Sequence, residues 1–349
     1  MDINIEPFHP IDASNELLDK YLEFYFNYLK ERDPDDPLPS KDYIKHRYRK
    51  KTPQWVFKRW IVFNKGSKDK IIAASSCVYT VTGATIALKK KDRARIRIIV
   101  AKNFRNQGIG TKLLKIITSE LQKTNKRVIE TTTSFDSGRR FCEKFDGKLI
   151  TESTESRLYL RRVDWRLINQ WRIENQQRNP EVSIELFTKI PEKDIEEFCE
   201  LYTEVTKQEP SEKDYQLIMT PELRRQREQQ WEQENIIWET MITRESTGAI
   251  SGITEISIYQ KGLPTNAYQG FTGVREKYRG RGLGKWLKAE MLTHIQNNYP
   301  KVKLVITDNT NINAPMLSIN RRMGFQFYKK VSEYTFEINQ LAQKFGIKD

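Results

Sequence analysis

The sequence predicts a mixed α/β (α+β) chain of two similar domains, each with a mixed, mostly antiparallel central sheet flanked by helices. The first observation behind this is a repeat. The stretch RNQGIGTKLLKIITSEL at 105–121 returns as RGRGLGKWLKAEMLTHI at 279–295, an offset of 174 in a chain of 349 residues. The second is that β-rich runs and helical stretches follow the same order in both halves. Two domains of about 170 residues account for both observations.

The elements of each half come in one order. A strand opens the half (INIEPF, VSIELF), a helical region follows, and antiparallel-looking strands lead to a glycine-rich turn that begins a helix. A second strand (KRVIETTT, VKLVITDN), a short helix ending in glycine and a last strand complete it. Between the halves, the polar segment DWRLINQWRIENQQRNP is helix-prone and closes on a proline. We therefore expect domains at 1–165 and 181–349, joined by a helical linker at 166–180.

Composition places the chain among globular proteins of a reducing compartment. An apolar content of 38% is enough to fill real cores, and no apolar run approaches the roughly 20 residues that cross a bilayer. The start, MDINIEPFHP, is neither basic nor apolar enough for a signal peptide. The three widely spaced cysteines, an odd number, argue against a disulfide framework and a zinc cluster. We expect a cytoplasmic protein that contacts no membrane and holds no metal.

The formal net charge of +14 calls for acidic partners. A Lys/Arg-rich solvated surface, together with a few cations for an anionic cofactor, is the favoured explanation. Nucleic acid is the weaker alternative, left open by the charge alone, because no aromatic-interleaved basic element such as an RNP signature is present.

The glycine-rich turn, KYRGRGLGKW in its second copy, has the features of a phosphate-binding site. Its spacing fits neither a P-loop, since Trp286 follows Lys285, nor a dinucleotide fingerprint, since Lys285 stands where the third glycine belongs. Both copies share Arg-x-x-Gly-x-Gly between a strand and a helix. Glycines let backbone N–H groups approach a diphosphate, and the helix N-terminus adds unpaired donors and partial positive charge. An apolar stripe, Leu283, Leu287, Met291 and Ile295, is expected to anchor the second helix.

These motifs resemble those of the GNAT acetyltransferase superfamily, whose Arg/Gln-x-x-Gly-x-Gly/Ala turn holds the pyrophosphate of acetyl-CoA. The tandem layout is similar to that of mycothiol synthase and related two-domain members. The resemblance implies acetyl-CoA as co-substrate and assigns its binding to two sets of residues: Val100, Arg105, Asn106, Gln107, Gly108, Ile109, Gly110 and Thr111 in the first repeat, and Gly273, Val274, Arg279, Gly280, Arg281, Gly282, Leu283, Gly284 and Lys285 in the second. The irregular segment GFTGV at 270–274 fits the bulged strand that pairs with pantetheine and holds the oxyanion.

Members of this superfamily use a carboxylate, often through water, to deprotonate the amine that attacks the thioester. Glu255 is the leading candidate for this base, in a strand whose alternation places it on one face with Ile253 and Ser257. A solvated strand glutamate is the alternative. Glu239 is the next candidate base, and Gln269 is a weaker candidate for orienting substrate or water.

The family also has an Asn-x-x-Ala-x-x-Leu-Tyr-x-x-x-Gly-Phe segment, matched here by NAPMLSINRRMGF. Asn313 falls on the Asn that contacts pantetheine, and Asn320 falls on the Tyr that protonates the leaving thiolate. Asn has no proton of useful pKa, so the position of this catalytic acid is filled by a residue that cannot serve as one. Tyr328 and Tyr334 are nearby in sequence.

The first repeat is poorer in such groups. A tentative alignment puts Cys77 opposite Glu255, where it is expected to be a small core residue rather than a nucleophile. Counting back from Gly147, the Asn and Tyr positions hold Asp136 and Glu143; counting from Asp146, they hold Phe135 and Cys142. Under either count neither family residue is present. We therefore expect CoA binding in both domains and chemistry in the second.

The resemblance implies an acetyl-CoA-dependent N-acetyltransferase that passes the acetyl group directly to a primary amine in a ternary complex. The acceptor is expected to be a small molecule or a peptide. The alternative is a non-catalytic acyl-CoA-binding or regulatory module, which the replacement at Asn320 favours.

Overall fold

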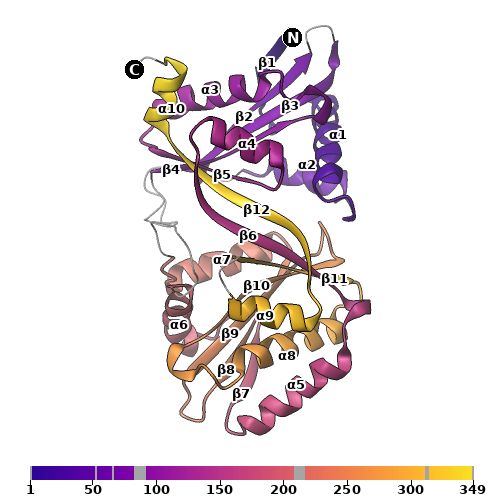
Figure 1. The fold of residues 1–349 in the computed structure, drawn as a ribbon, viewed down its shortest axis with the longest axis vertical. Helices are drawn as coiled ribbons and strands as arrows, with labels where there is room; N and C mark the ends of the chain where they lie inside the picture. The colour runs from indigo at the N-terminus through magenta and orange to yellow at the C-terminus, as the bar shows by residue number, and fades with distance from the viewer. Residues whose placement is uncertain are drawn as a thin grey trace. The chain divides into compact units, whose positions relative to one another are not determined.

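The computed structural model describes residues 2–51, 53–64, 67–81, 92–207, 217–310 and 314–347 (Figure 1). The chain forms two compact units. The N-terminal unit combines Met1–Thr151 with Val331–Asp349, and the C-terminal unit is Glu152–Lys330. Each is a mixed, mostly antiparallel sheet with helices on both faces, as the sequence predicts.

The N-terminal unit has the sheet order β1-β2-β3-β4-β5-β12, in which β4 and β5 are parallel and the other neighbouring strands are antiparallel. Helices α1 and α2 pack on one face and α3 and α10 on the other. Its elements are β1 (Ile3–Pro7), α1 (Asn15–Arg32), α2 (Lys41–Arg49), β2 (Trp55–Asn64), β3 (Ser67–Thr80), β4 (Arg93–Val100), α3 (Ile109–Gln122), β5 (Val128–Thr133), α4 (Asp136–Lys144), β12 (Gln326–Glu337) and α10 (Ile338–Phe345).

The C-terminal unit repeats this plan in the order β6-β11-β10-β9-β8-β7, with β10 and β11 parallel. Helices α6 and α7 cover one face, and α5, α8 and α9 cover the other. Its elements are β6 (Lys148–Tyr159), α5 (Trp165–Arg178), β7 (Ser183–Phe187), α6 (Ile195–Lys207), α7 (Pro221–Gln233), β8 (Ile236–Arg244), β9 (Ile250–Tyr259), β10 (Asn266–Val274), α8 (Leu283–Asn298), β11 (Leu304–Thr310) and α9 (Ala314–Met323).

The two repeats exchange their last strands. β12, which ends the second repeat, pairs with β5 of the first, and β6, which ends the first repeat, pairs with β11 of the second (Figure 1). The compact units therefore differ from the predicted ranges 1–165 and 181–349. The segment predicted as a helical linker is helix α5, and it packs into the C-terminal unit because Trp171 buries its indole in that unit's core.

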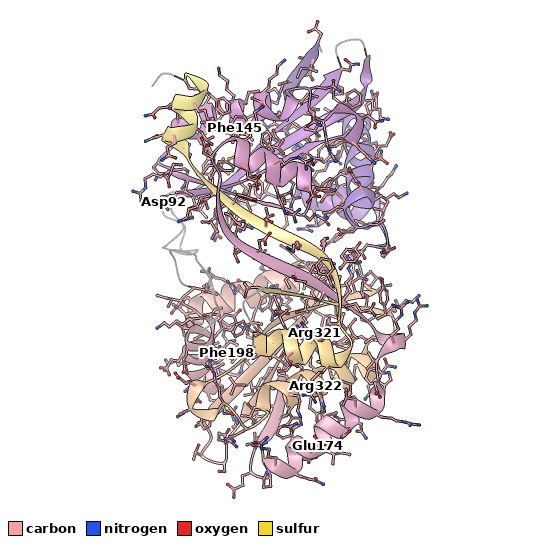
Figure 2. The ribbon with its side chains drawn as sticks, viewed as in Figure 1. Asp92, Phe145, Glu174, Phe198, Arg321 and Arg322 are labelled. Carbon is pink, nitrogen blue, oxygen red and sulfur yellow. The ribbon has the colours of Figure 1, made fainter. Side chains whose placement is uncertain are left out.

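The cores agree with the predicted patterns. The stripe Leu283, Leu287, Met291 and Ile295 of α8 is buried, and so are all three cysteines. Phe145 and Phe198, labelled in Figure 2, lie in the cores of the N-terminal and C-terminal units respectively. No helix in the described part of the chain is long and apolar enough to cross a membrane.

Four helices begin at a residue whose side chain caps them, whereas α3 and α8 do not. Ser14, Ser40, Asp164 and Thr220 cap α1, α2, α5 and α7, each accepting a backbone N–H of the first turn. Helices α3 and α8 begin instead at a glycine, and no side chain caps either of them. The first-turn N–H groups of these two helices are therefore available to a ligand.

Candidate functional site

Both glycine turns adopt one backbone shape. Gly108 and Gly282 stand at the N-caps of α3 and α8 with φ of 79° and 85°, in the left-handed region. Two residues earlier, Asn106 (φ 61°) and Gly280 (φ 77°) are also left-handed. These conformations turn successive N–H groups toward one point at the helix start, which is the arrangement that binds an anion.

The first arginine of each turn braces the turn. Arg105 Nε donates to the carbonyl oxygen of Val100 at 3.0 Å, and Arg279 Nε donates to that of Val274 at 3.4 Å. In the first repeat Arg105 also makes a two-pronged ion pair with Glu31, with both N–O distances at 2.7 Å. The two repeats therefore share this side-chain contact as well as the sequence motif.

Helix α5 supports the second turn from its carbonyl side. Arg178 donates to the carbonyl oxygen of Gly280 at 3.0 Å, and Asn179 Nδ2 donates to that of Arg281 at 3.2 Å. Arg281 also pairs with Glu245 at 2.9 Å. With the carbonyls held from one side, the N–H groups are fixed in position for a ligand on the other.

Lys285, in the first turn of α8, lies 5.1 Å from the ring centroid of Trp171. Its closest carboxylate is that of Glu174 (labelled in Figure 2), at 3.9 Å. A half-exposed glutamate at this distance holds the ammonium only weakly, so the cation remains available to an anionic ligand.

A matched pair of glycine substitutions, one in each turn, tests whether α5 braces the second turn. Both Gly108→Ala and Gly282→Ala force a side chain into the left-handed region, at about 1 kcal/mol each. A Cβ at Gly108 meets nothing within 4 Å, but one at Gly282 would lie 2.1 Å from Asn175 Oδ1. Moving that buried amide breaks its 2.7 Å bond to the carbonyl of Trp171, so Gly282→Ala should cost about 1 kcal/mol more. Native-state hydrogen exchange of α3 and α8 measures both costs, and equal costs would contradict the bracing by α5.

In each unit, the strand before the glycine turn and the strand after the following helix pair only over their first residues and then separate. β10 and β11 pair in parallel only from Asn266–Leu304 to Gln269–Thr307, and β10 then shifts register against β9 between Gln269 and Thr272. The predicted irregularity in GFTGV is thus confirmed. In the N-terminal unit β4 and β5 pair only from Arg93–Val128 to Arg95–Glu130. Each helix N-terminus therefore stands beside a pair of diverging strands.

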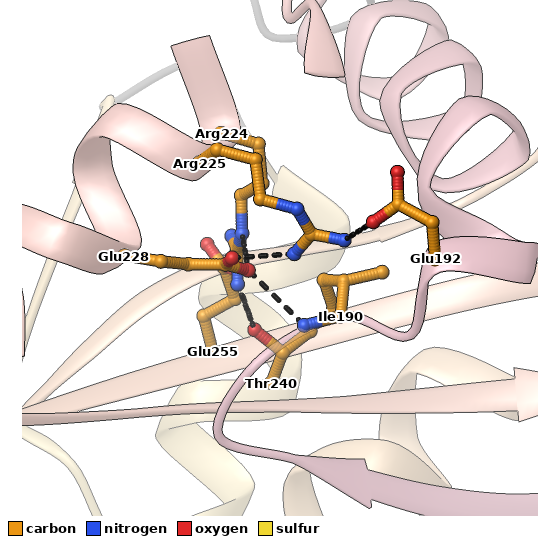
Figure 3. Close-up of polar contacts among 7 residues, drawn as sticks. All are labelled: Ile190, Glu192, Arg224, Arg225, Glu228, Thr240 and Glu255. Atoms are coloured by element: carbon orange, nitrogen blue, oxygen red, sulfur yellow. Dashed lines mark hydrogen bonds and ion pairs between the residues drawn. The ribbon is translucent and has the colours of Figure 1, made fainter. Parts of the chain in front are cut away.

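Glu255 lies in a buried polar cluster (Figure 3). Its Oε1 accepts Arg224 Nη1 at 2.7 Å and Thr240 Oγ1 at 2.9 Å, and Arg224 Nε also donates to Glu228 at 3.0 Å. Both Arg224 and Glu255 are 1% exposed. The carboxylate of Glu255 is therefore engaged by an arginine and a threonine within the protein interior. Burial and the charge of Glu255 also raise the pKa of Tyr202.

The two weaker candidates are engaged in structural contacts. Glu239 accepts His294 Nε2 at 2.8 Å and Tyr299 Oη at 2.6 Å, on the face of the sheet covered by α8. Gln269 Nε2 donates to Thr254 Oγ1 at 2.8 Å and to the backbone carbonyl of Glu255 at 2.9 Å. Glu239 thus links β8 to α8, and Gln269 links β10 to β9 where the strand separation begins.

Asp308 is a carboxylate that the sequence analysis missed. It follows Thr307, the last residue of β11 that pairs with β10, and its side chain shares the sheet face of Glu255. The residue is exposed to solvent, yet surrounding protein raises the pKa of its carboxyl by desolvation, and the nearby charge of Glu155 raises it further. The available signal was an acidic residue just past the apolar run LVIT at the end of a strand.

Comparison with known proteins decides the family. The model of the acetyltransferase (GNAT) family matches this chain twice, at residues 16–147 and 196–325. The chain belongs to the GNAT acetyltransferase family. No curated protein sequence matches it.

Solved GNAT structures share the tandem fold. A tandem GNAT protein from the clavulanic acid biosynthesis pathway is 21% identical, with a TM-score of 0.71 over 97% of this chain and 99% of that one. A GCN5-related N-acetyltransferase from Sphaerobacter thermophilus is 16% identical, with a TM-score of 0.65 over 96% of each chain. The GCN5-related glucosamine N-acetyltransferase region of a fungal GH3 β-N-acetylglucosaminidase is 12% identical, with a TM-score of 0.64 over 96% of this chain and 38% of that chain.

The GNAT segment around α9 departs from the family pattern in the structure as well. Asn313 lies outside the described residues. Asn320 is 2% exposed; its Nδ2 donates to Asn309 Oδ1 at 2.5 Å, and its buried Oδ1 has no hydrogen-bond partner among the residues that the structure describes. Neither nearby tyrosine takes its place: Arg157 stacks on the ring of Tyr328, with its guanidinium carbon 3.3 Å from the ring centroid, and Tyr334 lies in the core of the N-terminal unit.

The ends of α4 and α9 show whether Gly147 or Asp146 of the first GNAT repeat corresponds to Gly324. The N–H of Gly147 donates to the carbonyl of Cys142 at 2.9 Å, as the N–H of Phe325 donates to that of Asn320 at 3.0 Å. The preceding residue is left-handed in both repeats, Asp146 with φ of 56° and Gly324 with φ of 97°. Asp146 is thus the counterpart of Gly324, and the family's Asn and Tyr positions hold Phe135 and Cys142.

Strand register corrects the tentative alignment of Cys77 with Glu255. Val100 pairs with Ala73 as Val274 pairs with Gly252, and counting along β3 from there brings Ser76 to the position of Glu255. Cys77 faces the α3 side, where burial raises its pKa to about 12, so it is a core residue as expected. The error was one residue. Counting in the same way across the paired strands to β5 places Thr132 at the position of Asp308.

Proposed function

We propose that this GNAT protein is an acetyl-CoA-dependent N-acetyltransferase that transfers the acetyl group directly to a primary amine, with the chemistry in its C-terminal unit. The observation that carries the proposal is a separated strand pair, β10 and β11, in which β10 leads to an uncapped, glycine-built helix start and β11 carries an accessible carboxylate, Asp308, just beyond the last pair. The N-terminal unit has the first two features, but Ser76 and Thr132 stand in place of the two carboxylates.

The geometry of the turn supports acetyl-CoA as the donor in this proposal. The pyrophosphate would accept the first-turn N–H groups of α8, and Lys285 would add a cation. Pantetheine would run along the edge of β10 that β11 leaves unpaired, with Gly273 and Val274 beside the thioester. By the same features Gly108–Thr111 in the N-terminal unit would hold a second CoA.

For proton removal from the amine we favour Asp308 over Glu255. A base must be reachable by the acceptor and must not already be committed to a cation. Asp308 is exposed and its raised pKa makes it a stronger base than an ordinary aspartate, whereas Glu255 is buried against Arg224. In this proposal Glu255 is a positioning residue that fixes Arg224 and Thr240 behind β9.

A pH–rate profile of Asp308→Asn tests the base. The wild-type kcat/KM should fall as pH drops through the raised pKa of Asp308, because the carboxyl is then protonated and cannot accept a proton. Asp308→Asn should lower kcat/KM about 100-fold and remove that acid limb. Glu255→Gln serves as the comparison and should retain the limb. If Glu255→Gln removed the limb and Asp308→Asn kept it, the roles would be reversed.

Calorimetry with CoA, followed by thiol release from acetyl-CoA in the presence of a panel of amines and amine-bearing peptides, tests the function itself. Binding of CoA together with amine-dependent thiol release supports the transferase. Binding with no release by any amine would favour the alternative of an acyl-CoA-binding module, and absence of binding would refute both.

A further inference from the structure

Lys288 is a lysine at a core position of α8. It is 1% exposed, and its counterpart in the first repeat is Leu114, which is fully buried. Within the described residues its ammonium has no hydrogen bond or ion pair, and its one recorded contact is the ring of Phe325, 5.7 Å from Nζ. A long cationic side chain replaces leucine in an apolar core at considerable cost unless it has a function.

The start of α8 lies against the end of β10. Gly284 is beside Val274, because a Cβ on it would be 3.6 Å from Val274 Cγ2. Lys288 follows Gly284 by four residues, a rise of about 6 Å or the length of about two strand residues, so we infer that it stands near Thr272, beyond the last β10–β11 pair. Helical side chains lean toward the N-terminus, which brings Nζ back toward Val274.

Phe325 contacts Lys288 from the side of α9. It follows α9, and its N–H donates to the carbonyl of Asn320 at 3.0 Å. Lys288 of α8 therefore contacts the residue that follows α9, the helix in which Asn320 stands where a tyrosine would protonate the leaving group. Among the described residues, α9 offers no proton donor at that position, and α8 carries an ammonium without a hydrogen bond or ion pair.

Burial lowers the pKa of Lys288 to about 7, and no neighbouring charge contributes to that shift. This value is below the roughly 8.5 of an ordinary thiol, so proton transfer from the ammonium to a thiolate is favourable. The charged groups of the packed elements are directed elsewhere: Lys285 and Arg322 at Trp171, Glu290 at Arg172, Glu255 at Arg224, and Asp308 on the opposite sheet face.

We propose that Lys288 donates the proton that converts the departing CoA thiolate to the thiol, an inference that rests on the proposed acetyl transfer. The amine nitrogen bonds to the thioester carbonyl carbon, the C–S bond breaks, and its electron pair goes to sulfur. A proton moves from Lys288 Nζ to sulfur, and Asp308 takes the proton lost by the amine. Solvent reprotonates the neutral lysine after CoA leaves.

Titration of bound CoA tests the location of Lys288 without an acceptor. On the full-length Lys288→Arg variant, the thiolate ultraviolet absorbance of bound CoA should show a thiol pKa lowered by about one unit, because a guanidinium next to sulfur stays charged and favours the thiolate. The wild type and Lys288→Leu should show no such lowering, because the lysine has lost its proton where the thiol titrates and leucine carries no charge. Leucine is the residue of the first repeat at this position, so the variant is expected to fold. The exposed Lys301→Leu is the control and should change nothing.

Turnover with the best amine of the panel then tests proton donation. Lys288→Leu and Lys288→Arg should both lower kcat about 100-fold, since a guanidinium holds its proton at these pH values, and both should lose the alkaline limb near pH 7. Rescue by arginine would overturn proton donation, and an unshifted thiol pKa in Lys288→Arg would overturn the location. Failure of CoA to bind would instead refute the proposed function. If two CoA molecules bind, the titration is repeated with Gly108→Glu to block the first turn.

Discussion

Deletion of residues 331–349 is expected to abolish cooperative folding of the N-terminal unit, although the deleted residues belong to the second repeat. The segment supplies four buried side chains to the core around α3: Tyr334, Phe336, Ile338 and Leu341. At about 1.5–3 kcal/mol each, their loss amounts to about 6–12 kcal/mol, comparable with the whole stability of a domain. It also leaves β5 without its antiparallel neighbour β12.

Hydrogen exchange followed by mass spectrometry localises this effect. Amides of α3 and β5 should lose protection in the deletion variant, while those of α8 and β9 should keep it. Two point variants make the reciprocal comparison: Phe336→Ala should weaken the N-terminal unit, and Leu158→Ala the C-terminal unit, each by about 3–5 kcal/mol. Loss of protection in the unit encoded by the same repeat as the mutation would contradict the strand exchange.

Arg224→Met is expected to lower the free energy of unfolding of the C-terminal unit by about 3–5 kcal/mol. It leaves Glu255 and Glu228 buried without the cation that both of them contact. The reason is desolvation of the remaining carboxylates rather than loss of packing, since methionine fills much of the volume. Urea unfolding monitored by tryptophan fluorescence measures the change.

Two further variants separate charge from packing. Arg225→Met removes a half-exposed neighbour that pairs with Glu192 and Glu228, and should cost about 1 kcal/mol or less. The double variant Arg224→Met/Glu255→Gln should recover part of the loss, because it removes one unpaired charge. A double variant as unstable as the sum of its single changes would argue against a coupled ion pair.

The glycine turns could be predicted from sequence because their information is local. The backbone shape of Gly108 and Gly282 follows from residue type and spacing, and an approximate repeat supplied an internal control. The helix and strand order followed from apolar periodicity in the same way. Such features depend on neighbours within a few positions of the chain.

The remaining features depend on partners that are distant in sequence. β6 and β12 show the same alternation whichever sheet they join, so no local pattern reveals the exchange. The commitment of Glu255 to Arg224 joins residues 31 positions apart, through a helix whose placement was unknown. The Cys77 alignment failed by one residue because the register of β3 and β9 is set by their pairing with the next strand, which the sequence pattern does not show.

The exchange of strands also has a consequence for synthesis of the protein on the ribosome. β5 is made roughly 200 residues before β12, the strand that closes its sheet. At about 5–20 residues per second this is a delay of roughly 10–40 s. During that time the half made first presents an open strand edge and an unfilled core, a target for chaperones. A truncated translation product would keep both, so neither half can accumulate as a finished domain without the other.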